Sequence, residues 1–161
     1  MSPETAPGDY VELRFGPRWT YISCVRKFVA GFFMIGLADK ERAEQISLAV
    51  SELLENAVKY ASEEETSLRI SIARSAGEVD VCVANAVDPH QLSVFRREFA
   101  LATAGDSEGT YLRRMEEAAK TEGLSRLGLV RIRYETGARL HLETTTDRSV
   151  AIHAIFSVEA A

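Results

Sequence analysis

The sequence predicts a two-layer α/β (α+β) sandwich, in which helices cover one layer of a mixed, mostly antiparallel sheet. Three observations predict this fold. One long segment repeats apolar residues at helical spacing, two pairs of alternating runs meet at tight turns, and short helical segments lie between the two pairs. The predicted order is strand, helix, helix, two strands, helical insert, helix and two strands. A doubly wound parallel sheet would instead alternate strands and helices throughout.

The first elements follow a short N-terminal segment. Residues 1–9 are expected to form a flexible tail, and residues 10–161 a single domain. The alternation from Tyr10 to Phe15 predicts a half-buried strand that ends at Gly16-Pro17. Apolar residues at helical spacing from Tyr21 to Leu37 predict the first helix.

A second helix has the clearest pattern in the chain. Asp39 is its expected N-cap, because a carboxylate before the first turn can accept from a free backbone N–H. The helix carries one apolar stripe, which must lie on a sheet or another helix. The stripe contains Ile46, Ala49, Val50, Leu53, Leu54, Ala57 and Ala61.

Two hairpins are predicted from paired alternating runs. The first joins the runs containing Ile72 and Val79 around Ala76-Gly77, and the second joins Arg139–Thr146 to Val150–Val158 around Asp147-Arg148. Each alternation places one set of apolar side chains on a single face of the sheet.

Between the hairpins, the pattern changes to short helices. Residues 88–123 are expected to form a helical insert, with helices at Leu92–Ala102 and Ser107–Thr121 divided by Gly105-Asp106. A further helix is predicted over Leu127–Glu135, and Gly137 is expected to end it.

The composition bounds the class of protein. The chain has 161 residues, 46% of them hydrophobic, which is enough for one packed core. Its net charge of −5 makes nucleic acids and anionic membranes unsuitable partners. The start of the chain lacks the pattern of a signal peptide, and the apolar run Phe28–Leu37 is too short to span a bilayer. Cys24 and Cys82 form no CxxC pair, so two buried free thiols in a reducing, cytoplasmic setting are expected.

Three polar residues of the second helix form one ridge beside its apolar stripe. Glu52, Asn56 and Lys59 lie at i, i+4 and i+7. The amide oxygen of Asn56 can bind a cation, and Glu52 can take a proton or orient a water molecule. An ordinary solvated helix face carries the same residue types, so spacing alone leaves both interpretations open.

The segment around this ridge, Ser51-Glu52-Leu53-Leu54-Glu55-Asn56-Ala57-Val58-Lys59-Tyr60-Ala61, resembles the N-box of the GHKL superfamily of histidine-kinase-like ATPases. It is similar above all to the version in anti-sigma-factor serine/threonine kinases. The resemblance implies a Bergerat-type ATP-binding fold. It also implies that Asn56 holds the Mg²⁺ bridging the nucleotide phosphates, that Glu52 is the catalytic base, and that Lys59 is a nucleotide-binding residue.

A second resemblance lies before the final hairpin. The run from Gly123 to Val130 resembles the superfamily's second glycine box, where backbone amides at a helix N-terminus receive phosphate. Gly123 and Gly128 are therefore candidate nucleotide-binding residues. Their spacing also matches a P-loop, but Leu129-Val130 stands where Lys-Ser/Thr is required, which excludes one. Taken alone, the same residues also fit a helix C-cap glycine followed by a buried glycine.

The first glycine box of the superfamily is degenerate in this chain. The superfamily ends its middle strand with Asp-x-Gly-x-Gly, whereas this strand ends Val83-Ala84-Asn85-Ala86-Val87-Asp88-Pro89. Asn85 stands where the adenine-binding aspartate is expected, so it is the candidate adenine ligand, and the glycines are missing. Asp88 is the other acceptor in reach.

The strand end at Asn85-Ala86 and the run Gly128–Glu135 resemble the SiaB-type branch of regulators. That branch works in partner-switching circuits with STAS-domain (anti-anti-sigma-like) proteins and PP2C-type phosphatases. The resemblance implies a signalling regulator that binds ATP–Mg²⁺ and phosphorylates or sequesters a STAS-type partner. It also implies a homodimer, since related serine kinases commonly dimerise. The alternative is a pseudokinase, a binding module that no longer uses nucleotide. A detached histidine-kinase module is disfavoured, since no dimerisation helix pair accompanies the domain.

Other residue groups are assigned to structure. His90, His141 and His153 lack metal-ligand spacing, and the last two are expected on outward faces of the final hairpin. The arginine pairs Arg96-Arg97 and Arg113-Arg114 are expected on solvated faces of the insert, with a docking surface or contacts from the insert to phosphate as the functional alternatives. Four residues of the insert are expected to pack in its interior: Phe95, Phe99, Tyr111 and Met115.

Overall fold

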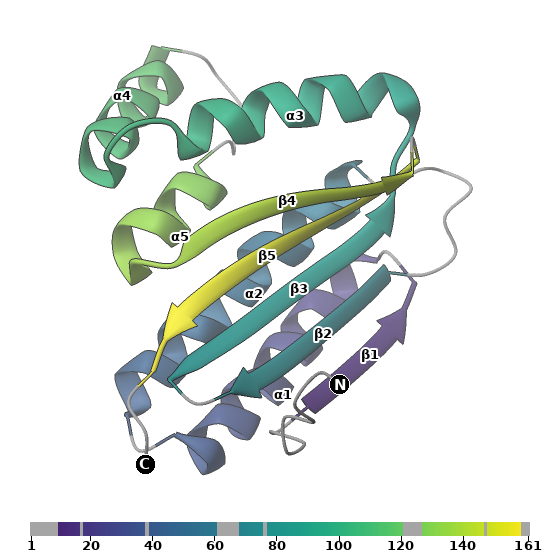
Figure 1. The fold of residues 1–161 in the computed structure, drawn as a ribbon, viewed down its shortest axis with the longest axis vertical. Helices are drawn as coiled ribbons and strands as arrows, with labels where there is room; N and C mark the ends of the chain where they lie inside the picture. The colour runs from purple at the N-terminus through teal and green to yellow at the C-terminus, as the bar shows by residue number, and fades with distance from the viewer. Residues whose placement is uncertain are drawn as a thin grey trace, which may run out of the picture.

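The computed structural model describes residues 10–16, 18–37, 39–60, 68–75, 77–120, 127–146 and 148–158. The described residues form five helices and five strands, which follow one another in the predicted order (Figure 1). In chain order they are β1 (Tyr10–Phe15), α1 (Trp19–Gly36), α2 (Lys40–Tyr60), β2 (Leu68–Ser75), β3 (Glu78–Ala86), α3 (Pro89–Thr103), α4 (Ser107–Lys120), α5 (Gly128–Thr136), β4 (Arg139–Thr146) and β5 (Ser149–Ser157).

The strands form one sheet in the order β1-β2-β3-β5-β4. Both predicted hairpins are confirmed, since Ser75 pairs with Glu78 in the first and Thr146 with Ser149 in the second. The two hairpins join through β3 and β5, whose register places Asn85 opposite Val150. The sequence predicted a mixed, mostly antiparallel sheet. In the structure every pairing between these strands is antiparallel. Ala76, Asp147 and the tail 1–9 lie outside the described residues.

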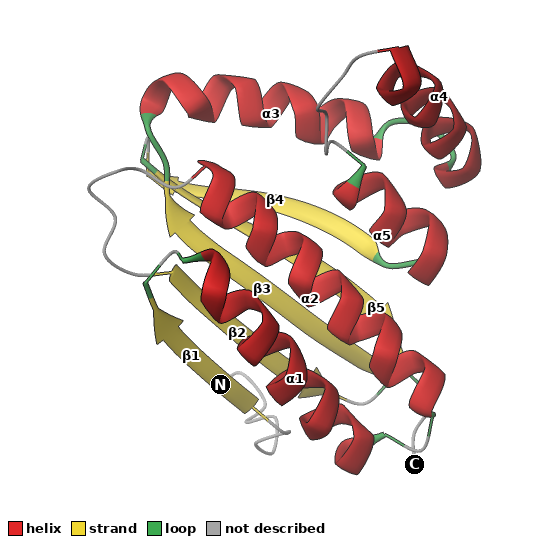
Figure 2. Cartoon of the chain, turned by 180° about the vertical axis from the view of Figure 1, so that it is seen from behind, coloured by secondary structure: helices red, strands yellow, loops and turns green. Residues whose placement is uncertain are grey.

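Helices α1 and α2 lie side by side across one face of the sheet (Figure 2). Asp39 is the N-cap of α2 as predicted, because its Oδ1 accepts from the backbone N–H of Arg42 at 3.1 Å. The predicted stripe is buried against the sheet from Ile46 to Ala57. Its largest members pack into a core with Phe33 of α1 and Phe156 of β5. The fold class that the sequence predicted, an α/β sandwich, is therefore confirmed.

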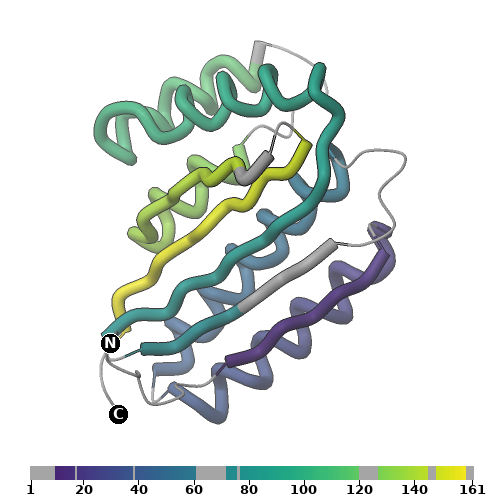
Figure 3. Tube along the Cα trace, turned by 45° about the vertical axis from the view of Figure 1, so that its right-hand side comes forward, coloured from purple at the N-terminus to yellow at the C-terminus, as the bar shows by residue number. Residues whose placement is uncertain are grey.

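The insert packs against one side of this sandwich, where Phe95 and Ala102 of α3 join the core (Figure 3). Helix α3 crosses beyond one end of the strands, and α4 and α5 lie next to it (Figure 1). Helix α5 ends at Gly137, whose φ of 69° is the left-handed conformation that favours glycine at a helix C-cap. This end was predicted, whereas the predicted C-termini of α2, at Ala61, and of α4, at Thr121, lie outside the described residues.

One side-chain prediction on the sandwich needs correction, that of Cys24, whereas the outward positions of His141 and His153 are confirmed. Cys82 is buried as expected, but Cys24 is an exposed free thiol on the outer side of α1. His153 lies on the outward face of the sheet between Asp80 and Glu143, with ring nitrogens 3.0 Å and 3.2 Å from their carboxylate oxygens. It is therefore partly buried in a polar cluster, while His141 is exposed. Across the described ranges, no three His, Cys, Asp or Glu side chains are arranged to hold a metal ion.

Candidate functional site

Helix α2 presents Glu52 and Asn56 on the flank that faces α5. Their neighbours Leu53 and Ala57 are buried against the sheet, which fixes the rotation of the helix. Residues at i and i+4 lie one above the other, so the carboxylate and the amide project in the same direction. Both are half-buried, which is unlike the fully solvated face that spacing alone left open.

Helix α5 begins against these two side chains. A Cβ atom on Gly128 would lie 2.6 Å from Oε2 of Glu52 and 3.7 Å from Nδ2 of Asn56. Glycine at position 128 therefore permits the close approach of the two helices. The side chain of the N-cap residue, Leu127, makes no capping hydrogen bond, so no side chain of the cap satisfies the first N–H groups of α5. The structure thus brings together three of the predicted site residues from segments about 70 positions apart.

Glu52 is held by Arg131, one turn into α5. Arg131 donates from Nη1 to Oε1 of Glu52 at 3.3 Å and from Nε to Oε1 of Glu135 at 3.4 Å. The side chain of Glu52 is 16% exposed. Burial raises the pKa of Glu52, and the negative charge of Glu55 raises it further, while Arg131 partly opposes this. A carboxyl group with a raised pKa in a partly closed site is typical of a general base.

The raised pKa of Glu52 predicts a pH-dependent stability difference. A folded-state pKa above the unfolded value means that the folded protein binds more protons across the window between the two values, so stability falls as the pH rises through it. The variant Glu52→Gln lacks this fall in stability, because its side chain does not titrate. We expect its melting temperature to match that of wild type below about pH 4, the ordinary range of a glutamate, and to exceed it at neutral pH. Thermal melts by circular dichroism at a series of pH values measure the difference, and a variant that is less stable at neutral pH contradicts the assignment.

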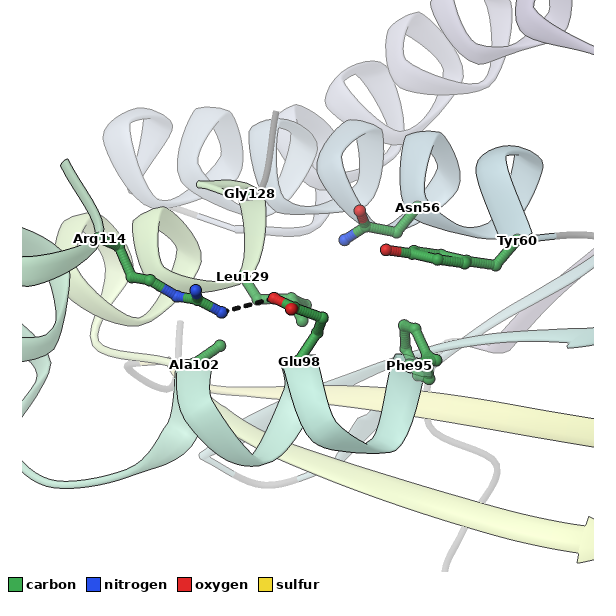
Figure 4. A pocket seen from close by; sticks show the side chains of 8 residues that line it. All are labelled: Asn56, Tyr60, Phe95, Glu98, Ala102, Arg114, Gly128 and Leu129. Atoms are coloured by element: carbon green, nitrogen blue, oxygen red, sulfur yellow. Dashed lines mark hydrogen bonds and ion pairs between the residues drawn. The ribbon is translucent and has the colours of Figure 1, made fainter. Parts of the chain in front are cut away.

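Asn56 also lines a small cavity under the insert (Figure 4). The cavity measures about 20 Å³, room for about one water molecule. It is lined by Asn56, Tyr60, Phe95, Glu98, Ala102, Arg114, Gly128 and Leu129. Figure 4 shows that α3 supplies one wall and α2 the opposite wall.

Asn85 lies deeper on the same side of α2. It is 7% exposed and lines a second hollow of about 10 Å³ together with Asn56, Tyr60 and Phe95. Its Nδ2 donates to the backbone carbonyl of Ala86 at 3.1 Å. Asn56 thus lies on both hollows, and the predicted adenine-side and phosphate-side residues are neighbours in space. Phe95 lines both hollows and is 3% exposed. The centroids of the Phe95 and Tyr60 rings lie 5.2 Å apart, in an edge-on arrangement.

Two further candidates lie away from this cavity. Lys59 is exposed, and its Nζ lies 5.4 Å from the ring centroid of Tyr60. Asp88 is the N-cap of α3, because its Oδ1 accepts from the backbone N–H of His90 at 2.9 Å. Asp88 therefore begins a helix and does not replace the adenine ligand. Gly123 lies outside the described residues.

The insert departs from prediction at several positions. Arg114 is not solvated, since its side chain is 11% exposed and reaches the cavity. Met115, expected in the interior, is 44% exposed. Phe95 is buried as expected, and Tyr111 stacks on Tyr134 of α5 at 4.6 Å. The sequence missed Tyr60 and Glu98 as site residues and gave a phosphate contact of Arg114 only as the alternative, because their roles depend on how α3 and α4 fold back on α2.

The fold and the residues of the site are those of a histidine kinase-like ATPase domain. The model of the histidine kinase-like ATPase domain matches residues 15–109 of the chain, so the chain belongs to this family. This confirms the family that the N-box indicated. The matched range contains Glu52, Asn56 and Asn85 and ends inside α4.

Two solved structures are similar to this chain. One is a chain of the crystal structure of the SiaB–SiaC complex from Pseudomonas aeruginosa, with 17% identity, a TM-score of 0.74, and coverage of 91% of this chain and 88% of that chain. The other is the NMR structure of the histidine kinase domain of the E. coli osmosensor EnvZ, with 17% identity, a TM-score of 0.43, and coverage of 99% and 94%. No curated protein matches the chain. In the part of the chain that the structure describes, no helix has the length and apolarity to cross a membrane.

The residues of the site fit one end of a nucleotide better than the other. At the phosphate end, the Asn56 amide, the Glu52 carboxylate and the glycine-opened start of α5 provide the donor and acceptor groups that a phosphate–Mg²⁺ pair requires. At the purine end, Phe95 and Tyr60 leave about 10–20 Å³, whereas pockets for ligands of this size measure roughly 300–1,000 Å³. The space between α2 and α3 in this structure is therefore too small for a purine.

Proposed function

We propose that this protein is a signalling regulator of the anti-sigma-factor kinase type, which phosphorylates a serine or threonine of a STAS-type partner with ATP–Mg²⁺. The observation that carries the proposal is the convergence of Glu52, Asn56 and Gly128 at the start of α5. Membership of the ATPase family and a fold similar to that in the SiaB–SiaC complex support it. Within the circuit, a PP2C-type phosphatase is the expected opposing activity.

Each of these residues has a role in phosphoryl transfer. Asn56 would hold Mg²⁺ through its amide oxygen, and the metal would neutralise charge on the phosphates. Glu52 accepts the proton of the partner's hydroxyl group as its oxygen bonds to the terminal phosphorus and the bond to the leaving ADP breaks. Arg131 holds Glu52 in place. The first backbone amides of α5, which no side chain of the cap residue Leu127 satisfies, would receive the phosphates. Asn85 is the proposed purine ligand, and Lys59 and Gly123 remain candidate nucleotide-binding residues.

A second function is favoured by one observation. Phe95 fills the purine end, and the side-chain Nδ2 of Asn85 donates to the backbone carbonyl of Ala86. A pseudokinase that sequesters its STAS-type partner without nucleotide would have such a site. The two functions share the partner and differ in the chemistry.

Transfer of phosphate separates the two functions. The purified protein would be incubated with labelled ATP, Mg²⁺ and the STAS-domain protein encoded nearest to its gene. The kinase predicts label on the partner, lost when the accepting serine is changed to alanine. A stable complex that forms equally well with and without ATP, with no label transferred, would establish the binding module.

Self-association is a further prediction of this proposal. Helix α1 exposes apolar side chains along its outer side, among them Phe28 at 46% and Ile35 at 91%. Such a surface is typical of an interface between chains. We expect a homodimer at micromolar concentration and a shift toward monomer in Phe28→Lys. Light scattering after size exclusion measures this, and a wild-type monomer at high concentration rules the interface out.

A further inference from the structure

Helix α3 turns one face into the cavity beside Asn56. Phe95, Glu98 and Ala102 lie at i, i+3 and i+7, so they project from the same side of the helix. Figure 4 shows the ring of Phe95 near Tyr60 and the carboxylate of Glu98 farther along, toward α4. The face thus presents a flat ring at one end and an anion at the other.

The anion is held by a buried arginine of the neighbouring helix. Arg114 of α4 donates from Nη2 to Oε2 of Glu98 at 2.6 Å, and the two side chains are 11% and 15% exposed. Its Nη1 donates to the exposed Glu117 at 3.1 Å. Its Nε is buried and has no hydrogen-bond partner in the part of the chain that the structure describes. Arg114 therefore keeps a spare donor inside the site.

Stability alone does not explain why the fold keeps this largely buried ion pair. Removing two charges from water costs free energy that their attraction seldom returns in full, and an apolar pair of similar size would join α3 to α4 equally well. A guanidinium with an unused donor is, however, well suited to exchange one anion for another, because its fork binds carboxylate and phosphate alike. The exchange explains the charges and the orphaned Nε together.

We propose that α3 is an internal competitor for the nucleotide: Phe95 occupies the place of the base, Glu98 the place of a phosphate, and Arg114 exchanges Glu98 for phosphate when α3 moves away. The inference rests on the proposed nucleotide site, with which this cavity shares Asn56 and Gly128. The closed form binds no nucleotide, so the observed affinity is the intrinsic affinity reduced by the fraction of open molecules. Any partner contact that draws α3 outward activates the site.

Opposite effects of the two partners of one ion pair test the proposal. Glu98→Gln loosens α3 and leaves Arg114 free, so ATP–Mg²⁺ should bind about fivefold more tightly than to wild type. Arg114→Gln breaks the same pair but removes the cation that receives phosphate, so binding should weaken by about fivefold. Glu117→Gln removes an exposed partner of Arg114 and serves as the matched control, with affinity unchanged. Calorimetric titration gives the three affinities, and near-ultraviolet circular dichroism shows that each variant is folded.

The outcomes separate this proposal from the nucleotide site on which it rests. Suppose that wild type binds ATP–Mg²⁺ and that the affinities of the two variants change in the same direction or not at all. The ion pair is then only structural, which overturns the competitor and leaves the nucleotide site in place. No binding in wild type or in Glu98→Gln at millimolar ATP–Mg²⁺ overturns the site as well. If Arg114→Gln does not fold, the change in ATP–Mg²⁺ affinity of Glu98→Gln alone decides. Tighter binding than wild type supports the competitor, and unchanged or weaker binding refutes it.

Discussion

Replacing Glu52 by glutamine should lower the rate of phosphate transfer by about 10²–10⁴-fold, the usual effect of losing a general base. The substitution preserves the shape of the side chain, so α5 can still pack against α2 at Gly128. An amide cannot accept the proton of the partner's hydroxyl group at neutral pH. Binding of ATP–Mg²⁺ should remain, because Asn56 and Arg114 keep their positions in the cavity.

A matched control for this variant lies on the same helix. Glu44 is an exposed glutamate of α2, two turns before Glu52, and lines neither of the hollows beside Asn56. Glu44→Gln makes the same change of charge and should transfer phosphate at the wild-type rate. Transfer assays with labelled ATP measure both variants. Wild-type transfer by Glu52→Gln would show that the proton has another acceptor.

The second large effect is expected from Gly128→Ala. The new methyl group would lie 2.6 Å from Oε2 of Glu52, so the carboxylate must move away from its place at the start of α5. The neighbouring atom is the end of a flexible side chain, and the cost in stability should therefore stay at or below the 1–3 kcal/mol of an overpacked core. Misplacing a reacting group by about 1 Å costs on the order of 100-fold in rate, and we expect a loss of that size in transfer.

Gly31 provides the control for this substitution. It lies inside α1, and a Cβ atom there would meet nothing within 4 Å. Gly31→Ala should raise stability by roughly 0.5–1 kcal/mol, as expected for alanine in a helix, and leave transfer unchanged. Paired unfolding and transfer measurements on both variants isolate the contact with Glu52. If Gly128→Ala transfers phosphate normally, the close approach of α5 has no role in the chemistry.

Much of the fold was predictable because its signals are local. The stripe of α2 from Ile46 to Ala57 has a period that fits one helix, and the alternation on either side of Gly77 fits one hairpin. Helix α3 shows how a local signal can be missed. It begins at Pro89 after the cap Asp88, three residues before the predicted start, because a proline at the first helical position is a start signal.

The part of the site formed by α2 and α5 was predictable from the sequence, whereas the part formed by the helical insert was not. Glu52, Asn56 and Gly128 carry a motif, so their convergence could be predicted. Glu98 and Arg114 carry none, and in sequence they match an ordinary charged helix face. Their burial depends on α3 and α4 folding back over α2, a tertiary contact that no periodicity encodes. The same contact explains why Met115, one position later on α4, faces solvent.

Calorimetric titration with ATP–Mg²⁺ is the decisive measurement, since the proposed chemistry requires that the site binds nucleotide. Replacing the adenine-binding carboxylate by the amide of Asn85 should cost on the order of 1–3 kcal/mol, so we expect saturable binding at about tens of micromolar or weaker. Asn56→Ala should lose the Mg²⁺-dependent part of this binding, and Glu52→Gln should keep it. Saturable binding that needs Asn56 is the predicted result; no binding at millimolar nucleotide, or equal binding by Asn56→Ala, would contradict the account.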